Sequence, residues 1–527
     1  MESSTLHEQP DSRAVVTSQP HWWYSSDFIA RLGIFSALYL AFSLPIMLAG
    51  RPYLDDIGRN LTGSAGWTQV GRPMANLTME AMNFSLDYIT NLSPLPLLLS
   101  IIILAAVSAW ATIRFQMRLD VGILGFGTLV CNPFFLENLS YQFDCLPMSL
   151  GVAFAMLPVL LDRHFASRSF ALLSVACIII SLSFYQPSAN VYIVMSCFAV
   201  VTRLDRATTF RHVIHECSFL LTYLIGAFLY RLMLTFLPLD GYAKSHARAL
   251  RPEQASDIIK NLLIIYRDIS ENLLYSTSTI ILLALIVLAG ISGLLGILRV
   301  RTSISTKTTQ ITFAIAIFSI MLLGIAGPLA ILENPVLAPR VFIGFGAVGA
   351  CALTLLVQTY RGTWLDPVVK IFIVIVLLGQ LTMSFAYGNA LSAQSAFEEG
   401  MARNIVEDIH SIAESTPAVL LISGEGFTAL TVKRQQKRYP IIKALVFPII
   451  KEDGYWGGIL LRVNGLSDNV VIPDTVHGQS RVDRIAAACQ HPRVINRRYY
   501  DIFQNGQDII LDFDKQCEGR SPSKINL

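Results

Sequence analysis

Residues 51–59 read Arg-Pro-Tyr-Leu-Asp-Asp-Ile-Gly-Arg, and they follow almost directly on the first long apolar run of the chain, at 28–49. The segment continues to Gly71-Arg-Pro73. It places two adjacent carboxylates and two arginines at a membrane surface: Asp55, Asp56, Arg59 and Arg72. Charged groups next to an apolar span are costly to bury and are usually functional. We therefore predict that the chemistry of this protein is arranged around this loop.

The composition is that of a membrane protein. Of the 527 residues, 53% are hydrophobic and only 15% are charged, whereas a soluble domain is usually about 25% charged. Repeated apolar runs are long enough to cross a bilayer, so we predict an all-α polytopic membrane protein. About eleven spans are expected, near 28–49, 94–113, 119–136, 145–161, 169–184, 189–202, 216–238, 274–298, 309–332, 340–360 and 367–388. The net charge of +3 comes from scattered residues, so no nucleic-acid partner is expected.

The charges of the short loops predict the topology. Basic loops alternate along the chain with loops that contain no lysine or arginine. The basic ones are 114–118, 162–168, 203–212, 299–307 and 360–370, and the others include 132–144, 185–188 and 333–339. Cytoplasmic loops carry the excess of Lys and Arg, so the N-terminus is placed in the cytoplasm and the C-terminus outside. A ten-span alternative, with 169–202 as one kinked span, would put basic loops on both sides.

Three regions follow from this topology. Residues 1–27 are predicted to be a disordered cytoplasmic N-terminus, 28–388 the membrane domain, and 389–527 a small extracytoplasmic α/β domain. The membrane domain carries two long outer loops, at 50–93 and 239–272. In the first loop, an apolar stripe at helical spacing predicts a helix lying on the membrane surface; its members are Met74, Leu77, Ala81 and Phe84. The second loop is basic and suits an anionic partner such as a lipid phosphate, although solvated charge explains it equally well; a second surface helix is expected at 258–265.

The C-terminal region changes from apolar runs to a mixed pattern. A polar helix is predicted over 392–414 and a short helix over 482–489. Strands are predicted at 418–423, 458–463, 469–472, 499–503 and 508–513, the last two joined by Asn505-Gly506. Asn-Gly between two apolar runs is a strong hairpin signal. Gly424-Glu-Gly426 lacks the third glycine of a dinucleotide-binding loop, which disfavours nucleotide binding. If this domain lies outside the cytoplasm, Cys489 and Cys517 can pair.

The two aspartates are the candidate catalytic residues. Adjacent side chains in a loop point in different directions, so Asp55 and Asp56 do not form a carboxylate pair. One of them is a suitable general base towards a substrate hydroxyl, while the other orients a partner. The alternative is a helix cap, for which Asp is common. Because the acids are adjacent and His246 stands alone, neither a metal nor another cofactor is indicated.

Other polar residues on the outer face are candidates for binding substrate. Arg59, Arg72 and Arg340 can hold a phosphate because a guanidinium forks onto its oxygens; snorkelling at the interface is the alternative. Glu137 and Asp144 flank Tyr141-Gln-Phe and are expected to bind sugar hydroxyls, unless they are solvated loop residues. Tyr185 and Gln186 stand at a helix break, where irregular backbone usually lines a cavity. The residues of this set are Arg59, Arg72, Glu137, Asp144, Tyr185, Gln186 and Arg340.

Several of these motifs together resemble a known family. They are Tyr53-Leu-Asp-Asp-Ile-Gly-Arg59, Gly66-Trp67, Gly71-Arg-Pro73, the segment 132–144 and Ser183-Phe-Tyr-Gln-Pro187. In this order they resemble the bacterial and prophage serotype-converting glucosyltransferases that modify O-antigen, the Gtr type II-like enzymes. The resemblance covers roughly 28–390 and leaves the C-terminal domain unassigned.

This resemblance implies a GT-C-like membrane glycosyltransferase of the bacterial inner membrane. The expected donor is glucose or a related hexose on a polyprenyl phosphate. A donor synthase would make it, and a flippase would move it across the membrane. The acceptor is an O-antigen lipopolysaccharide glycan, on the periplasmic side. An acid of the first outer loop, Asp55 or Asp56, would activate the acceptor hydroxyl for inverting transfer. Arg59 and Arg72 of the motif, with Arg340 added by our own inference, would neutralise the leaving lipid phosphate.

Three other hypotheses about the function remain. A transporter or flippase for a lipid-linked sugar explains the spans and the arginines, but alternating access expects polar groups near the midplane and repeat symmetry. An O-antigen ligase or polymerase would also face outward and would differ in its acceptor. A non-enzymatic surface module would use the C-terminal domain alone, and about eleven spans exceed what an anchor needs.

Overall fold

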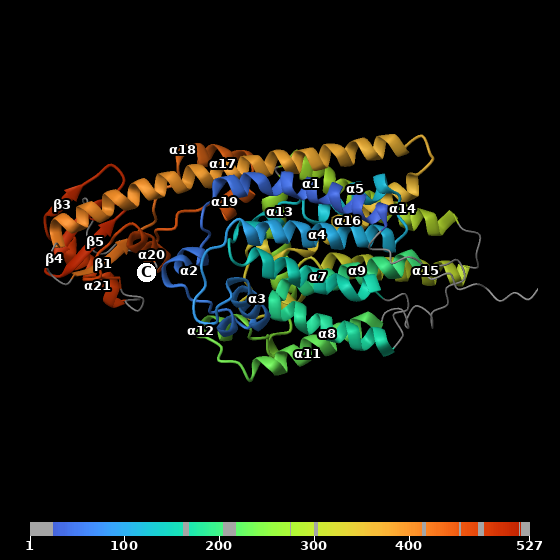
Figure 1. The fold of residues 1–527 in the computed structure, drawn as a ribbon, viewed down its shortest axis with the longest axis horizontal. Helices are drawn as coiled ribbons and strands as arrows, with labels where there is room; N and C mark the ends of the chain where they lie inside the picture. The colour runs from blue at the N-terminus through green and yellow to red at the C-terminus, as the bar shows by residue number, and fades with distance from the viewer. Residues whose placement is uncertain are drawn as a thin grey trace, which may run out of the picture.

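The computed structural model is a long helical bundle with a small mixed sheet at one end (Figure 1). It describes residues 25–161, 168–203, 218–274, 276–299, 304–413, 418–452, 455–472, 479–515 and 517. The predicted disordered N-terminus lies outside the described residues up to residue 24, and residues 26 and 27 already belong to helix α1. The basic segments 162–167, 204–212 and 300–303 also lie outside them.

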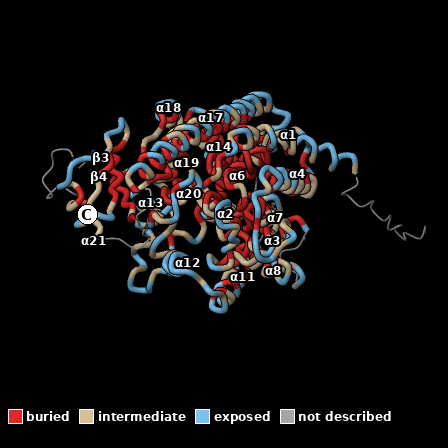
Figure 2. The backbone as a smooth tube through the Cα atoms, turned by 60° about the vertical axis from the view of Figure 1, so that its left-hand side comes forward, coloured by how far each residue is buried: buried red, intermediate tan, exposed pale blue. Residues whose placement is uncertain are grey.

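Helices form the bulk of the molecule and pack around a continuous apolar core. In the bundle they are α1 (Ser26–Ala49), α4 (Leu95–Arg114), α5 (Leu119–Phe126), α6 (Phe135–Ser140), α7 (Cys145–Leu161), α8 (Arg168–Phe184), α9 (Ala189–Arg203), α11 (Ser218–Leu234), α14 (Thr277–Arg299), α15 (Ile304–Leu323), α16 (Gly344–Tyr360) and α17 (Asp366–Ala413). Their buried side chains make one large cluster, so the backbone in the middle of the bundle is the most deeply buried (Figure 2).

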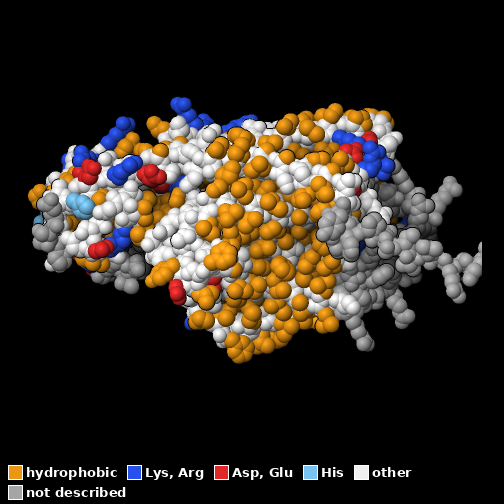
Figure 3. Space-filling view, viewed as in Figure 1, with side chains coloured by type: hydrophobic (Ala, Val, Ile, Leu, Met, Phe, Trp, Pro, Cys, Tyr) orange, Lys and Arg blue, Asp and Glu red, His pale blue; other side chains and the backbone are white. Residues whose placement is uncertain are grey.

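Several of these helices have the length and composition of membrane spans. Within the described residues, four helices are long and apolar enough to cross a bilayer: Ser26–Ala49, Leu95–Arg114, Thr277–Leu298 and Asp366–Ala413. Six shorter apolar helices accompany them. Hydrophobic side chains cover the broad face of the bundle (Figure 3), which is the surface expected in contact with lipid. The chain is therefore a mostly helical, membrane-like protein, and the count of eleven spans stays a prediction.

Two helix breaks interrupt apolar segments of the bundle. The predicted span at 119–136 is divided into α5, a 3-10 turn at Gly127–Leu129 and the short helix α6. The predicted break between α8 and α9 is confirmed, and a 3-10 turn at Gln186–Ser188 fills it. Pro187 lies in this turn and lacks the N–H that a continuous helix needs.

Short helices cover one end of the bundle. They are α2 (Asp55–Thr62), α3 (Pro73–Asn83), α12 (Gly241–His246) and α13 (Asp257–Leu273), the last of which extends the helix predicted at 258–265. Helix α3 packs through Ala75 and Met79 in a small core with Trp67. The predicted apolar stripe of α3 therefore faces outward, with Leu77 and Phe84 among the exposed residues.

Helix α17 connects the bundle to the C-terminal unit. It has 48 residues, which at 1.5 Å per residue gives a length of about 70 Å, more than twice the apolar thickness of a bilayer. The sequence suggested a span ending at 388 and a separate polar helix over 392–414. The structure joins them into one helix because Tyr387 to Leu391 contain no proline and Gly388 packs against Pro45 of α1.

The C-terminal unit is a mixed five-stranded sheet with short helices. The strands are β1 (Ala418–Ser423), β2 (Val470–Val471), β3 (Arg493–Asn496), β4 (Asp501–Asn505) and β5 (Asp508–Asp512), in the order β2-β1-β5-β4-β3. Strand β1 is parallel to β2 and β5, and β4 is antiparallel to β3 and β5. The remaining helices are α18 (Leu430–Arg438), α19 (Ile441–Leu445), α20 (Tyr455–Val463) and α21 (Gln479–Ala488).

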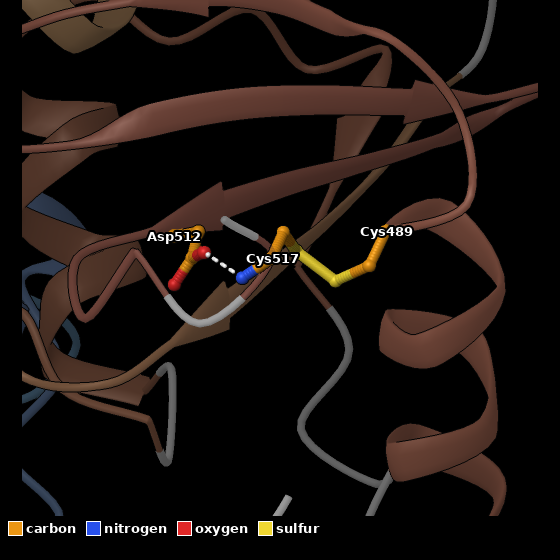
Figure 4. Close-up of a disulfide and its surroundings, with 3 residues drawn as sticks. All are labelled: Cys489, Asp512 and Cys517. Carbon is orange, nitrogen blue, oxygen red and sulfur yellow. Dashed lines mark hydrogen bonds between the residues drawn. A yellow bond between two sulfur atoms is a disulfide. The ribbon is translucent and has the colours of Figure 1, made fainter. Parts of the chain in front are cut away.

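The structure tests the strand predictions for this unit. The hairpin at Asn505-Gly506 is confirmed, with Gly506 at φ 58°. The strand predicted at 458–463 is wrong, because this segment lies in helix α20. A short apolar run does not distinguish helix from strand by its periodicity, and here Gly457 and Gly458 let the helix pack closely on Ile450 and Ile472. Cys489 and Cys517 form a disulfide between α21 and the segment after β5 (Figure 4).

The C-terminal unit is packed against the same end of the bundle. Ile441, Ile442 and Leu445 of α19 belong to the core of the bundle, while Ile57 of α2 belongs to the core of the C-terminal unit. Helix α20 lies against α2 (Figure 1). The acidic loop is therefore held between the bundle and the sheet.

Candidate functional site

Helix α2 carries the acidic pair in its first turn. Leu54, the residue before it, has φ 47° and ψ −104°, a conformation that a leucine rarely adopts. Such strain costs about 1–3 kcal/mol and persists only where the surroundings impose it. The turn places Asp55 and Asp56 on different faces of α2, so the two carboxylates have different environments.

Asp56 is fully buried and bound to backbone N–H groups. Its Oδ2 accepts hydrogen bonds from the N–H groups of Tyr53, at 2.9 Å, and Gln142, at 2.8 Å, and its Oδ1 accepts one from Phe143 at 3.3 Å. Burial raises the pKa of Asp56 to about 7, although these hydrogen bonds lower it. The carboxylate of Asp56 thus joins α2 to the segment between α6 and α7, and no part of it is open to a ligand.

Asp55 is the open carboxylate of the pair. Its side chain is 43% exposed, and its Oδ2 lies 3.7 Å from Nη1 of Arg59, one turn along α2. Desolvation by the surrounding protein raises the pKa of Asp55, while the Arg59 guanidinium lowers it. Asp55 can therefore meet a ligand, and it does so beside a fixed positive charge.

Asp144 brings the two arginines of the loop together. Its buried carboxylate accepts a hydrogen bond from Nε1 of Trp67 at 2.7 Å. It also lies 3.2 Å from Nη1 of Arg59 and 3.6 Å from Nη1 of Arg72. The guanidinium of Arg59 stacks over the Trp67 ring, 4.2 Å from the centroid. A single buried acid therefore orients both guanidinium groups.

The residues of the helix break position Arg72. Nε of Arg72 donates to Oε1 of Gln186 at 3.0 Å, and its guanidinium lies 4.8 Å from the centre of the Tyr185 ring. Gln186 in turn donates to the carbonyl of Val70, at 3.2 Å, and to the hydroxyl of Tyr230, at 3.0 Å. Irregular backbone between α8 and α9 thus serves to fix an arginine that comes from the segment before α3.

Arg340 and Glu137 form a second charged pair at the same end of the bundle. The guanidinium of Arg340 is ion-paired with Glu137, and the Arg340 N–H donates to the same carboxylate at 2.9 Å. The hydroxyl of Tyr185 donates to the Arg340 carbonyl at 3.1 Å, and the Arg340 guanidinium lies 5.7 Å from the centre of the Tyr141 ring. Tyr185 therefore contacts both Arg72 and Arg340 and links the two groups.

The structure brings all the predicted site residues to one cluster. Asp55 lies within electrostatic range of Arg59, Arg72 and Arg340. Glu137 and Asp144 are buried partners of these arginines, so their predicted contact with sugar hydroxyls stays a prediction. Within the part of the chain that the structure describes, no group of three His, Cys, Asp or Glu side chains could hold a metal ion. The cluster combines an open carboxylate with guanidinium groups that suit an anionic ligand.

Sequence reasoning missed two residues of this cluster. Trp67 is fully buried, and although Gly66-Trp67 is one of the family motifs, the sequence assigns no role to its side chain. Tyr230, near the end of the apolar helix α11, donates to the carbonyl of Gly71 at 2.9 Å. A tyrosine inside an apolar helix is the signal that could have indicated it, because a buried hydroxyl needs a partner.

Comparisons with known proteins point to the same region. The model of a family described as glucosyl transferase GtrII matches residues 44–351. This range contains every residue of the cluster and ends before α17. A protein of Salmonella phage P22, described as an uncharacterized 55.3 kDa protein in the gtrB 5' region, is 26% identical over 452 residues, which cover 84% of this chain and 92% of the phage protein. No solved structure matches the fold.

Proposed function

Because this chain belongs to the glucosyl transferase GtrII family, we propose that it is a membrane enzyme that glucosylates an O-antigen glycan. The proposed donor is glucose on a polyprenyl phosphate, and the proposed acceptor is a hydroxyl of the lipopolysaccharide glycan. The phage protein encoded beside gtrB supports this assignment, because it covers most of the same chain. A hexose related to glucose would use the same chemistry.

Asp55 is the proposed general base. The single observation that carries this role is the contrast within α2: the Asp56 carboxylate is engaged by three backbone N–H groups, whereas 43% of the Asp55 side chain is exposed. In the proposed reaction the acceptor hydroxyl gives its proton to Asp55 as its oxygen attacks the anomeric carbon. The bond from that carbon to the lipid phosphate breaks on the opposite side, which inverts the configuration. The raised pKa of Asp55 makes it a stronger base than an ordinary aspartate.

The arginines are proposed to stabilise the leaving phosphate. Arg72 and Arg340 have side chains that are 23% and 20% exposed, so both guanidinium groups can reach a ligand. Each is already fixed by a buried acid and an aromatic ring, and such preorganised charges stabilise developing negative charge without further reorganisation. Arg59 completes this arrangement between Asp55 and Asp144. No residue role here requires a metal or another cofactor.

The proposed setting is the periplasmic face of the bacterial inner membrane. The charge bias of the short loops supports a GT-C-like arrangement of about eleven spans, with the N-terminus cytoplasmic and the domain 389–527 periplasmic. The Cys489–Cys517 disulfide supports an oxidising compartment for that domain. A donor synthase and a flippase would supply the lipid-linked glucose. A transporter is less well supported, since the charged cluster lies at one end of the bundle rather than at a midplane between repeats.

The reaction can be tested in membranes that contain the full chain. Incubation with polyprenyl-phosphate glucose and O-antigen lipopolysaccharide should transfer glucose to the polysaccharide, and nucleotide-linked glucose should not replace the donor. Membranes without the protein are the control. Absence of transfer from the lipid-linked donor, with the protein present and folded, would contradict the proposal.

A further inference from the structure

A groove lies outside the charged cluster, where α17 meets the loop between β3 and β4. Its volume is about 640 Å³, and it is lined by Phe397, Gly400, Arg403, Asn404, Arg498 and Tyr499 among others. All the α17 residues of this groove lie in the polar half of the helix, outside the family match at 44–351. Neither the family nor the proposed reaction assigns a role to it.

One wall of the groove is aromatic and rigid. The ring of Tyr499 meets the rings of Phe397 and Phe427 at centroid distances of 5.3 Å in both cases. The neighbouring Arg497 forms two hydrogen bonds with Asp408 of α17, at 2.9 and 2.6 Å, so the loop that carries Tyr499 is tied to the helix. An aromatic surface held in this way can contact a ligand at little entropic cost.

The other groups of the groove are polar and available. Within the described part of the chain, the side chains of Asn404 and Glu407 form no hydrogen bond, and Arg403 donates only to the carbonyl of Glu399, at 3.3 Å. Arg497 and Arg498 also line the groove, and the Arg497 guanidinium is ion-paired with Asp408, so an amide, a carboxylate and guanidinium groups together offer both donors and acceptors. Figure 3 shows acidic and basic side chains interspersed on the C-terminal unit, whereas hydrophobic ones cover the bundle. This mixture suits neither a lipid chain nor a polyanion, and it suits a ligand rich in hydroxyl groups that also has an apolar face.

Helix α17 links the groove to the charged cluster. The hydroxyl of Tyr387 lies 2.7 Å from that of Ser140, next to Tyr141 of the cluster. Phe397 and Glu407 stand ten and twenty residues further along the same helix, which corresponds to about 15 and 30 Å of helix length. Helix α17, which runs from the bundle to the sheet (Figure 1), therefore holds the groove residues at a set distance from Tyr387.

We propose that this groove is a second, non-catalytic binding site for the acceptor glycan chain. This inference rests on the proposed function, because it takes the acceptor to be a polysaccharide of many repeats. The reacting sugar would lie at Asp55 while a distant repeat of the same chain stacks on Tyr499 and bonds to the polar groups opposite. Binding at two points raises the effective concentration of the acceptor at the cluster.

Gly400→Leu is the most direct variant. A Cβ at Gly400 meets no atom within 4 Å, so a leucine fits the helix and projects into the groove. Ser392→Leu adds the same side chain at an exposed position of α17 that does not line the groove, and it serves as the matched control. Tyr499→Ala is the second groove variant, and Tyr455→Ala, at a half-exposed tyrosine of α20, is its control.

Binding should be measured by titration calorimetry on the full chain in detergent. The chain also carries Asp55→Asn, so that no glucose is transferred during the titration. The probe is O-antigen polysaccharide of many repeats, compared with a single repeat. We expect Gly400→Leu and Tyr499→Ala each to weaken polysaccharide binding at least tenfold, as the loss of one stacked contact and its partners would, while both controls bind as the parent does. Unchanged polysaccharide binding by Gly400→Leu would overturn the inference.

Kinetics separate this inference from the proposed reaction. With Asp55 intact, the groove variants should raise KM for the long acceptor and leave the rate with a single-repeat acceptor unchanged. If the protein transfers glucose but the groove variants show equal KM for both acceptors, the groove proposal fails and the reaction stands. If no transfer occurs with any acceptor while the polysaccharide still binds, the reaction is the part that fails.

Discussion

Arg51 and Glu398 form a buried ion pair, with 2.6 Å between Nη2 and Oε2, although 347 residues separate them in the chain. Oε1 of Glu398 also accepts from the N–H of Ile449, at 2.7 Å, and from the Gln394 side chain, at 3.1 Å. The pair thus connects the segment that leads into α2 with both α17 and the C-terminal unit. The position of Asp55 depends on this connection as well as on the bundle.

Removing the carboxylate of this pair should destabilise the protein and displace α2. Glu398→Ala leaves Arg51 buried without its partner, and breaking a buried pair in this way costs about 3–5 kcal/mol. We expect a clearly lower Tm in detergent together with a lower rate of glucose transfer. Glu399→Ala, at the exposed neighbour, is the control and should change neither. Equal Tm values for the two variants would contradict the proposed role of the pair.

Asp56 should make the stability of the protein depend on pH. Its pKa is raised to about 7 in the folded protein, against about 3.9 in an unfolded chain. Between these two values the folded state binds more protons than the unfolded state, so stability falls as pH rises through this window. Because of this titration of Asp56, we expect the Tm of the wild-type protein to fall as the pH rises from 4.5 to 7.5.

Asp56→Asn removes the titrating group and supplies the comparison. Its Tm should change less over the same pH window than that of the wild type, since the amide carries no charge at either end. The measurement is a series of thermal unfolding curves at several pH values, with Asp87→Asn, at an exposed aspartate, as the control. An identical pH dependence in Asp56→Asn and the wild type would exclude Asp56 as its source.

Trp67 should act through Asp144 and Arg59. Trp67→Phe keeps an aromatic surface under Arg59 but removes the N–H that donates to Asp144 at 2.7 Å. A hydrogen bond to a charged group contributes about 1.5–3 kcal/mol, so we expect kcat/KM for transfer to fall by roughly 10- to 100-fold. Trp364→Phe, at an exposed tryptophan, should retain full activity. Full activity in Trp67→Phe would show that the N–H does not support the site.

Arg72 should not be replaceable by lysine. Arg72→Lys keeps the positive charge but loses both the stacking on Tyr185 and the planar fork that donates to Gln186. If Arg72 holds the lipid phosphate, KM for the donor should rise about tenfold or more. Arg248→Lys, at a largely exposed arginine in the segment between α12 and α13, is the matched control. A donor KM equal to that of the wild type would show that Arg72 does not bind the lipid phosphate.

The sequence predicted the parts of this arrangement that are local. Asp55, Arg59 and Arg72 lie in one motif, and the break at Gln186-Pro187 follows from proline chemistry. The apolar runs located the helices, and Asn505-Gly506 located the hairpin. Each of these depends on residues close to one another in the chain.

Long-range contacts could not be predicted in the same way. That Asp144 pairs with both Arg59 and Arg72, and that Asp56 binds the backbone of Gln142 and Phe143, depends on how α2 packs beside α6 and α7. Asp55 and Asp56 are neighbours in the sequence, and the sequence does not show which carboxylate is exposed and which is buried. The prediction of a strand at 458–463 rests on a short run of five apolar or small residues and Arg462, which fits either structure, and only the packing of α20 on α2 decides between them.

The assignment of the base is tested most directly by the rates of glucose transfer of Asp55→Asn and Asp56→Asn, measured side by side with lipid-linked glucose and O-antigen acceptor. Loss of a general base typically costs about 10²- to 10⁴-fold. We predict a loss of this size in Asp55→Asn, with donor binding and Tm unchanged, and in Asp56→Asn a smaller loss that accompanies altered stability. Transfer by Asp55→Asn at the wild-type rate would contradict the account.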